Sequence, residues 1–217
     1  MKIALIGASG FVGTALLNEA LQRGHQVTAI VRHPEKITVK NDNLTVKKGD
    51  AFNKEEIKDL VKGHDVVLSS YNPGWTNPNI YSEFIKASET LQQATKESGV
   101  KRFFIIGGAG SLEIAPGLQL IDTPQFPAEY KEGASAARDY LNIIKKEDQL
   151  DWTFYSPAIE MHPGITTGRT GKYRLGTDQP VFNDENRSIH SAEDLSIAVI
   201  DELENKKFIK KRFTAAY

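Results

Sequence analysis

The fold is decided near the N-terminus by residues 2–13, which read KIALIGASGFVG. Ile3 to Ile6 form a short apolar run, and a run that is apolar on both faces is typical of a parallel strand covered by helices. The run leads into the spacing G-x-x-G-x-x-G at the start of a helical pattern. Glycines there allow a sharp turn and bring backbone N–H groups against a pyrophosphate at the positive end of a helix. The stretch therefore predicts the first strand, phosphate turn and helix of a Rossmann-type domain. The candidate cofactor contacts in it are Gly7, Ser9, Gly10, Phe11, Val12 and Gly13.

Apolar runs and helical patterns continue to alternate along the rest of the chain. We expect further strands at 27–31, 44–46, 65–69, 100–106, 152–155 and 212–216. We expect helices at 11–21, 54–61, 81–98, 129–146 and 192–203, the last with Ser191 as its N-cap. Such alternation predicts an α/β fold with a doubly wound, mostly parallel sheet and right-handed crossovers.

The alternation of apolar runs and helical patterns stops after Pro157. Glycines between 164 and 176 divide short, Thr-rich and basic pieces that indicate a hairpin rather than a helix. We therefore expect residues 157–190 to form a small lid or substrate lobe. The chain has no internal repeat and no low-complexity linker, so we expect one domain over residues 1–217.

The composition excludes several classes of protein and partner. The 27 basic and 28 acidic side chains nearly cancel, so no global field favours nucleic acid or an anionic membrane surface. The chain has no cysteine, which excludes disulfides, thiolate nucleophiles and thiolate metal ligands, and we identify no candidate metal site. The apolar run Ile3–Ile6 is too short for a signal peptide or a membrane span, so we expect a cytoplasmic protein.

The end of the second expected strand bears on which dinucleotide is bound. Proteins that hold a ribose 2′-hydroxyl usually carry Asp or Glu about 20 residues after the glycine motif. This chain has Arg32, 25 positions after Gly7, and no acid in residues 29–33. A guanidinium pairs bidentately with a 2′-phosphate, so we expect NADP(H), with NAD(H) the less favoured cofactor. A solvated loop cation is the alternative interpretation of Arg32.

Three polar residues follow the next two strands at the same edge of the sheet. Asp50 comes just after the third strand and could accept a hydrogen bond from the adenine amino group. Ser69 and Ser70 end the fourth strand beside the expected cofactor cleft. Capping and turn roles suit all three equally well, so both roles stay open.

Residues 107–111, Gly-Gly-Ala-Gly-Ser, end the fifth strand. Dense glycine at the carboxyl end of a strand brings backbone close to a ligand or a neighbouring loop, and Gly108 is the candidate cofactor contact there. The Ser111 hydroxyl is the natural one to face a nicotinamide or substrate, although a capping role is equally open. Tyr130 and His162 are further candidate proton donors, for which structural roles are the commoner alternative.

Together these segments resemble the short-chain dehydrogenase/reductase superfamily, and within it the atypical NmrA-like group of candidate NADH-flavin reductases. The resemblance covers essentially the whole chain, and its second half is the more specific because many families share the first glycines. It implies a NAD(P)-binding Rossmann fold and an activity of the flavin-reductase type. The segments that carry it are 7–13, 107–113, 151–158, 169–176 and 212–217, which read GASGFVG, GGAGSLE, DWTFYSPA, RTGKYRLG and RFTAAY.

The chain departs from the superfamily in its catalytic signature, Tyr-x-x-x-Lys. Without a lysine one helical turn away, no tyrosine has the partner that would lower its pKa, and the usual proton relay to an alcohol or ketone cannot be assumed. Hydride transfer to a flavin-like ring stays open, because such a ring accepts hydride from NADPH and takes its proton from solvent. Four positions after the six tyrosines that precede Tyr217 stand Trp75, Ile85, Ala134, Ile144, Ile159 and Thr177.

Two functions from different classes follow. The first is an NADPH-dependent oxidoreductase, monomer or homodimer, that transfers hydride to a small-molecule acceptor such as a flavin, a quinone or a similar conjugated ring. The second is a regulatory protein that senses NADP(H) without catalysis, as the NmrA resemblance permits. The missing tyrosine and lysine pair favours the second function. The length of 217 residues, with no added interaction domain, favours the first.

Overall fold

The computed structural model describes residues 1–217, in which strands and helices alternate through most of the chain. The strands are β1 (Lys2–Ile6), β2 (Gln26–Val31), β3 (Leu44–Lys48), β4 (Val66–Ser69), β5 (Arg102–Ile106), β6 (Glu113–Ala115), β7 (Leu118–Gln119), β8 (Asp151–Ser156), β9 (Arg174–Gly176) and β10 (Lys211–Ala216). The α-helices are α1 (Phe11–Gln22), α2 (Lys54–Val61), α3 (Ile80–Ser98), α4 (Ala128–Ile144) and α5 (Ala192–Asn205), and the 3₁₀ turns are η1 (Pro34–Lys36), η2 (Ala109–Ser111) and η3 (Leu120–Asp122).

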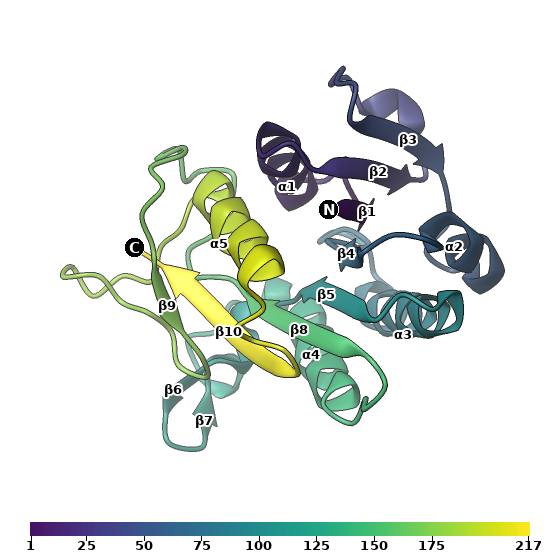
Figure 1. Ribbon diagram of the computed structural model, residues 1–217. Coiled ribbons are helices and arrows are strands. Elements are labelled where there is room, and N and C mark those ends of the chain that lie inside the picture. Colours follow the sequence, from purple (N-terminus) through teal and green to yellow (C-terminus); the bar gives the residue numbers. More distant parts are fainter.

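Eight of the strands form one sheet in the order β3-β2-β1-β4-β5-β8-β10-β9 (Figure 1). All neighbouring strands are parallel except β9, which runs antiparallel to β10. The chain builds from β1 through β2 to β3 and then crosses back to β4 on the other side of β1. The predicted doubly wound, mostly parallel α/β fold is confirmed. The strand order reverses between β1 and β4, the place where such folds bind ligands at the carboxyl edge.

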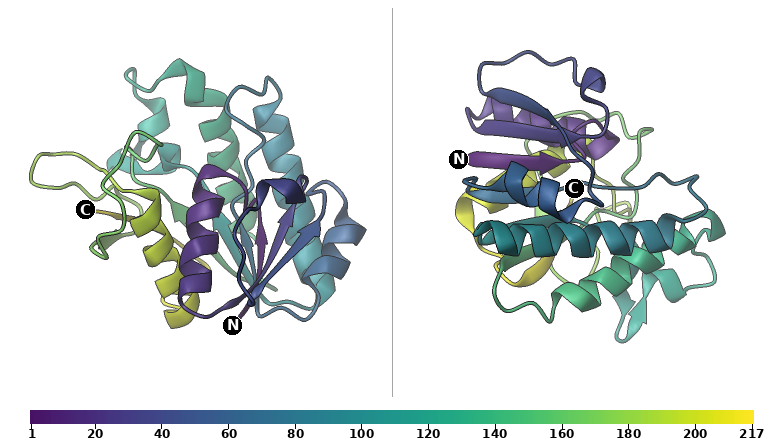
Figure 2. Two further views of the ribbon diagram at one scale, coloured as in Figure 1. Left: turned by 90° about the horizontal axis from the view of Figure 1, so that it is seen from above. Right: turned by 90° about the vertical axis from the view of Figure 1, so that its right-hand side faces the viewer.

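Helices cover both faces of the sheet (Figures 1 and 2). α1 and α5 pack together on one face, and α2, α3 and α4 lie on the other. Side chains alternate between the two cores along each strand, so Phe103 of β5 joins the core under α3 and α4 while Phe104 joins the core under α1 and α5. Burial on both faces explains why the strands read as continuous apolar runs.

Several helix ends follow local sequence signals. The Asn53 side chain accepts a hydrogen bond from the N–H of Glu56 at the start of α2. Ser191 does the same for the N–H of Asp194 at the start of α5, so the predicted N-cap is confirmed. Gly99 ends α3 in the left-handed conformation, with φ +85°.

The prediction of a hairpin within residues 157–190 is wrong. The segment contains one strand, β9, and its pairing partner is β10 at the end of the chain. An isolated bridge between Glu160 and Ile189 provides the only other strand-like pairing there. Glycine and threonine content correctly excluded a helix, but it does not reveal a partner strand 40 residues away in the sequence. A hairpin does occur where none was predicted, between β6 and β7.

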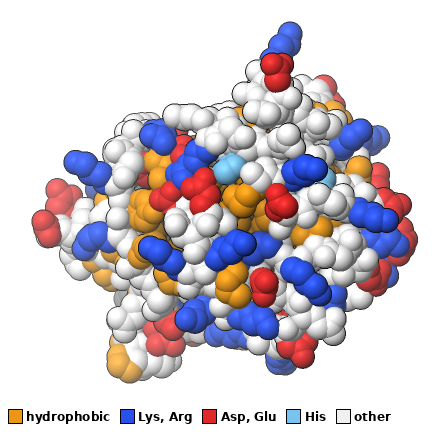
Figure 3. Space-filling view, in the orientation of Figure 1, with side chains coloured by type: hydrophobic (Ala, Val, Ile, Leu, Met, Phe, Trp, Pro, Cys, Tyr) orange, Lys and Arg blue, Asp and Glu red, His pale blue; other side chains and the backbone are white.

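The surface carries charges of both signs. On the face shown in Figure 3, basic and acidic side chains are interspersed and neither sign forms a broad patch. This distribution accords with the near-zero formal net charge of -1. No helix has the length and apolar character that crossing a bilayer requires.

Candidate functional site

The glycine turn connects β1 directly to α1 at the carboxyl edge of the sheet. Gly7 has φ +83°, a left-handed conformation that favours glycine, and its N–H donates to the carbonyl of Ile30 at 3.2 Å. The N–H groups of the first helical turn, from Phe11 to Gly13, have no acceptor within the chain, and no acidic side chain lies in that turn. Unpaired N–H groups at the positive end of a helix form a site for an anion.

Ser70, the residue after the neighbouring strand β4, holds this turn in place. Its hydroxyl lies 3.1 Å from the carbonyl oxygen of Ile6 and 3.2 Å from that of Gly7, and its backbone N–H donates to Ile6 at 2.9 Å. Ser69 is buried, and its hydroxyl oxygen accepts from the N–H of Tyr71 at 3.4 Å. The structure therefore gives both serines a supporting role around the turn, and direct cofactor contact by either stays a prediction.

The three glycines of the motif meet different surroundings. A Cβ on Gly13 would lie 2.0 Å from the carbonyl oxygen of Gly7, and one on Gly7 would lie 2.8 Å from that of Ser70. The fold itself requires these two glycines. A Cβ on Gly10 would meet only the Gly7 oxygen, at 3.4 Å, and Gly10 is exposed. Gly10 thus leaves open space in front of the unpaired N–H groups, which suits a pyrophosphate. Of the other candidate contacts, Ser9 and Phe11 are exposed and Val12 is half-buried.

Arg32 lies beside the glycine turn at the same edge of the sheet. The parallel register pairs Ile6 of β1 with Ile30 of β2, so Arg32 follows β2 just as the turn follows β1. Its side chain is exposed and makes no hydrogen bond or ion pair. Glu35 is the nearest acid along the chain, and its carboxylate pairs instead with His33 at 3.1 Å. The guanidinium therefore stands free for an anionic ligand.

Asp50 and Tyr71 lie on the same side of the site. The Asp50 carboxylate closes a turn by accepting from the N–H of Phe52 at 3.0 Å, and the residue is exposed. Tyr71 was not singled out from the sequence, because nothing but its position after Ser70 marks it. It is buried, and its hydroxyl has no hydrogen-bond partner. Burial raises the pKa of this hydroxyl to about 12, against the opposing charge of Arg32.

The glycines after β5 make room for neighbouring protein atoms. A Cβ on Gly107 would lie 1.9 Å from the Phe154 ring, and a Cβ on Gly108 would lie 3.1 Å from the methyl group of Ala137 in α4. Close packing against β8 and α4 therefore accounts for the glycine density of residues 107–110. A cofactor contact at Gly108, which is half-buried, stays a prediction.

Ser111 is hydrogen-bonded to Arg212, a partner that the sequence did not predict. Its side chain is buried, and its hydroxyl oxygen accepts from Nη1 of Arg212 on β10 at 3.0 Å. The same arginine forms an ion pair with Asp178. The structure thus supplies a packing role for Ser111. A role in proton transfer remains a prediction.

The other two candidate proton donors lie in different settings. Tyr130 stands in the first turn of α4, 46% exposed, with its ring edge-to-face against Trp75 at a centroid distance of 5.3 Å. His162 is exposed, and its Nδ1 accepts from the N–H of Gly164 at 3.1 Å. The other tyrosine of α4, Tyr140, is fully buried, with its hydroxyl 3.2 Å from the carbonyl oxygen of Ser88. No tyrosine of α4 is therefore paired with a lysine.

Residues 157–190 are fixed to both helices of one face. The buried carboxylate of Asp194 in α5 accepts hydrogen bonds from Thr170, from the N–H of Gly171 and from the hydroxyl of Tyr217. Burial alone would raise the pKa of Asp194, but these hydrogen bonds outweigh it and hold the pKa below its usual value. Arg169 pairs with Glu19 of α1 at 2.9 Å. These polar contacts thus anchor residues 157–190, the expected lobe, to α1 and α5.

His190, in the same region, predicts a dependence of stability on pH. It is buried among Tyr155, Tyr173, Tyr217 and Asp194, and its Nε2 has no partner. Burial lowers its pKa to about 4 from the ordinary 6.5, against the opposing effect of Asp194. Below pH 6.5 the His190 imidazole therefore binds a proton in the unfolded chain, whereas in the folded chain it stays neutral until the pH approaches 4. We expect up to about 3 kcal/mol of stability to be lost from this group as pH falls from 6.5 toward 4.

Urea unfolding at several pH values in that window tests this expectation. The pH dependence of the unfolding free energy should be shallower in His190→Gln than in the parent, whereas the matched exposed variant His162→Gln should keep the parent slope. Comparison of slopes removes the contribution of carboxylates common to all three proteins. An unchanged slope in His190→Gln would show that His190 is not buried in its neutral form.

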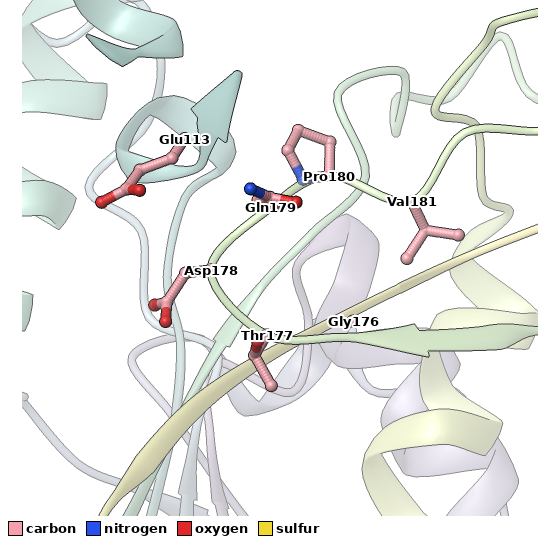
Figure 4. Close-up of a pocket in the computed structure, with 7 residues that line it drawn as sticks. All are labelled: Glu113, Gly176, Thr177, Asp178, Gln179, Pro180 and Val181. Atoms are coloured by element: carbon pink, nitrogen blue, oxygen red, sulfur yellow. The ribbon is translucent and has the colours of Figure 1, made fainter. Parts of the chain in front are cut away.

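Two of the surface hollows, both away from the glycine turn, bear on the site. One, of about 510 Å³, is lined by polar residues around the end of β9, where the carboxylates of Glu113 and Asp178 lie on its walls (Figure 4). The Asp178 carboxylate is already bound by Arg212. The other, of about 340 Å³, lies beside Phe52, at the side of the sheet where Asp50 follows β3. Only the second adjoins residues of the predicted dinucleotide site.

The fold and the turn define the class of this protein. A parallel sheet with a strand-order reversal, unpaired N–H groups at the first helix and an open glycine beside them are the features of a Rossmann protein that binds a dinucleotide. The chain belongs to the NAD(P)H-binding family, which matches residues 7–206. The predicted nicotinamide cofactor is confirmed at this level. The family does not distinguish NADP(H) from NAD(H).

Relatives match the chain over its whole length. A solved structure of a candidate epimerase from Bacteroides thetaiotaomicron is 50% identical, with a TM-score of 0.92, and the match covers 100% of this chain and 96% of that one. A candidate NADH-flavin reductase from Streptococcus pneumoniae is 36% identical, with a TM-score of 0.86, over 100% and 99% of the two chains. The uncharacterised protein YwnB of Bacillus subtilis is 37% identical over 99% of this chain and 97% of its own. The resemblance to NAD(P)H-binding, reductase-like proteins is confirmed.

Proposed function

We propose that the protein is an NADPH-dependent oxidoreductase that transfers hydride to a flavin, a quinone or a similar conjugated acceptor. The observation that carries the choice of NADPH is Arg32, an exposed guanidinium without an ion-pair partner beside the glycine turn. The N–H groups at the start of α1 would hold the pyrophosphate. Asp50 and the hollow beside Phe52 lie on the side expected for the adenine.

Arg32→Ala should remove most of the preference for NADPH over NADH. Charge-assisted hydrogen bonds to a 2′-phosphate should favour NADPH in the parent by roughly 1.5–3 kcal/mol, which is about tenfold or more in affinity. Calorimetric titration of parent and variant with each dinucleotide measures the preference directly.

Lys36→Ala provides the matched control for Arg32, because Lys36 is an exposed cation four positions further along the chain with no ion pair. Its removal should leave the preference unchanged if the effect depends on the placement of a guanidinium and not on charge in general. Equal affinity of the parent for NADPH and NADH would refute the choice of cofactor.

The chemistry suits an acceptor that needs no protein acid. When bound, NADPH would supply the hydride for the acceptor ring, and solvent would supply the proton. The chain's own contribution is then to hold donor and acceptor at a reacting distance. The absence of a lysine-paired tyrosine on α4 supports this type of acceptor. So does the 36% identity to the Streptococcus pneumoniae candidate NADH-flavin reductase.

Tyr130→Phe should therefore keep most of the activity. Removal of a general acid typically slows a reaction by about a hundredfold or more, whereas a solvent proton makes the Tyr130 hydroxyl dispensable. The measurement is the rate of NADPH oxidation with a flavin acceptor, compared with Ser111→Ala and His162→Ala. A hundredfold loss in Tyr130→Phe with NADPH binding intact would identify Tyr130 as the proton donor.

A regulatory protein that senses NADP(H) is the second candidate function. The observation that favours it is that neither tyrosine of α4 is paired with a lysine, so the usual proton relay of the superfamily is missing. Incubation with NADPH and a panel of flavins and quinones separates the two functions. Oxidation of NADPH supports the enzyme, and tight binding without turnover supports the sensor.

Our proposal places the protein in the cytoplasm, as a monomer or homodimer acting on a small molecule. The absence of a helix that could span a bilayer and the interspersed surface charges support this placement. Cell fractionation with an antibody against the chain tests the location.

A further inference from the structure

We propose that Trp75 and Tyr130 form the platform on which the ring of the acceptor stacks. This inference rests on the proposed function for the nature of the acceptor, which it narrows to a planar conjugated ring. The two residues come from different elements. Trp75 lies in the loop between β4 and α3, and Tyr130 lies in the first turn of α4.

Both rings are exposed to an unusual degree for large aromatic side chains. Trp75 is 54% exposed and Tyr130 is 46% exposed, although their centroids lie only 5.3 Å apart. Their planes meet at 83°, so the edge of one ring lies against the face of the other, and each ring keeps one face outside this contact. An edge-to-face pair with open faces forms a corner into which a flat ring can stack.

Helix α4 holds the Trp75 indole in place through a contact at Gly133. Gly133 is buried, and a Cβ on it would lie 2.7 Å from the Trp75 ring and 2.8 Å from Ile80. Glycine at this helical position therefore lets the indole lie against the helix backbone. The contact with α4 therefore fixes the position of the exposed Trp75 ring, whereas a loop side chain that is only solvated has no fixed position.

The pair lies at the part of the site where the acceptor must bind. The loop that carries Trp75 begins at Ser70, which hydrogen-bonds to the glycine turn. Next to Gly133 on α4, Ala134 packs against Gly110 of the segment after β5. Two loops of the carboxyl edge therefore meet around the aromatic pair, beyond the β1 to β4 reversal. In the right-hand view of Figure 2, α3 and α4 run side by side, with the loop before α3 at one end of the pair.

On the side of Trp75, the corner favours a ring without charge of its own. Residues 72–79 of the loop read NPGWTNPN and contain no charged side chain. Stacking on indole and phenol gains from flat apolar area and does not require hydrogen-bond readout. The acceptor that suits this corner is a neutral, planar, conjugated ring such as the isoalloxazine of riboflavin.

Tryptophan fluorescence offers a readout of ring binding that needs no turnover. The chain has two tryptophans, and Trp152 is only 3% exposed, with its indole N–H bonded to the carbonyl oxygen of Glu147. Riboflavin, with and without NADP⁺ present, should quench the emission of Trp75. The Trp75→Phe protein, which retains Trp152, corrects for light absorbed by riboflavin.

Steady-state kinetics with riboflavin and NADPH supply the second readout. Trp75→Ala and Tyr130→Ala should each raise the KM for riboflavin about tenfold, the loss expected for one stacking ring, and leave the Kd for NADPH unchanged. Trp75→Phe and Tyr130→Phe should restore most of the affinity. Gly133→Ala keeps both aromatic rings but displaces the indole, so it should also raise the KM. Phe182→Ala removes an aromatic residue 39% exposed in the segment after β9 and should change nothing.

The outcomes separate the platform from the proposed reductase activity. Turnover with an unchanged KM in Trp75→Ala and Tyr130→Ala would overturn the platform and leave the reductase standing. Saturable quenching of Trp75 by riboflavin without NADPH oxidation would support the platform and refute the reductase. Each variant is compared at equal folded fraction by circular dichroism. If Trp75→Ala or Tyr130→Ala fails to fold, the KM of Gly133→Ala and the quenching of Trp75 by riboflavin decide the question.

Discussion

Replacement of Gly10 by valine should leave the protein folded and weaken NADP(H) binding by about a hundredfold or more. Gly10 has φ −79° and ψ 172°, a conformation open to any residue, and it caps α1 without a side-chain hydrogen bond. An added Cβ would meet only the Gly7 carbonyl oxygen, at the ordinary contact distance of 3.4 Å. The valine methyl groups would instead occupy the space in front of the unpaired N–H groups. Loss of one or two charge-assisted hydrogen bonds, at about 1.5–3 kcal/mol each, accounts for the expected change.

Calorimetric titration with NADPH measures the affinity, and circular dichroism with thermal unfolding shows whether Gly10→Val is folded. Gly10→Ala, with a single methyl group, should show a smaller loss of affinity and gives the graded control. A folded Gly10→Val protein with the affinity of the parent would mean that the pyrophosphate does not lie against this turn.

The parts of the fold that the sequence predicted are those set by local patterns. Strands such as β1 and β8 are buried on both faces, so their apolar runs are continuous and visible. The helix α2 was predicted with its observed bounds, because Asn53 caps its start and its apolar residues recur with helical spacing. The hairpin expected within residues 157–190 was wrong, because β9 pairs with β10, which follows α5 in the chain.

Within the site, too, local patterns could be predicted from the sequence and contacts between distant residues could not. The glycine turn and Arg32 could be singled out because their roles depend on position relative to one strand and one helix. The contact between Ser111 and Arg212 joins residues 101 positions apart, and no local pattern predicts it. The aromatic corner of Trp75 and Tyr130 likewise depends on how α4 packs beside the loop after β4. Pairs of this kind need the three-dimensional fold.

Gly13→Ala should be strongly destabilising, in contrast to any change at Gly10. Gly13 lies in the first turn of α1 and is buried, and its added Cβ would lie 2.0 Å from the carbonyl oxygen of Gly7 and 2.9 Å from the Ser70 hydroxyl. The nearer obstacle is backbone, which cannot rotate away. Relief requires α1 to move from β1, which separates well-packed residues of the core under α1 and α5.

We expect Gly13→Ala to lose about 4 kcal/mol or more of unfolding free energy, a size that marks the disruption of a packed backbone. For a chain of this length, that corresponds to a fall of about 10 °C in Tm. Urea and thermal unfolding measure both quantities. Gly10→Ala makes the same chemical change three residues earlier, where the Cβ has room, so its Tm should stay close to that of the parent. Equal stability of the two variants would contradict the close approach of α1 to the glycine turn, because the one structural difference between them is what the added methyl group meets.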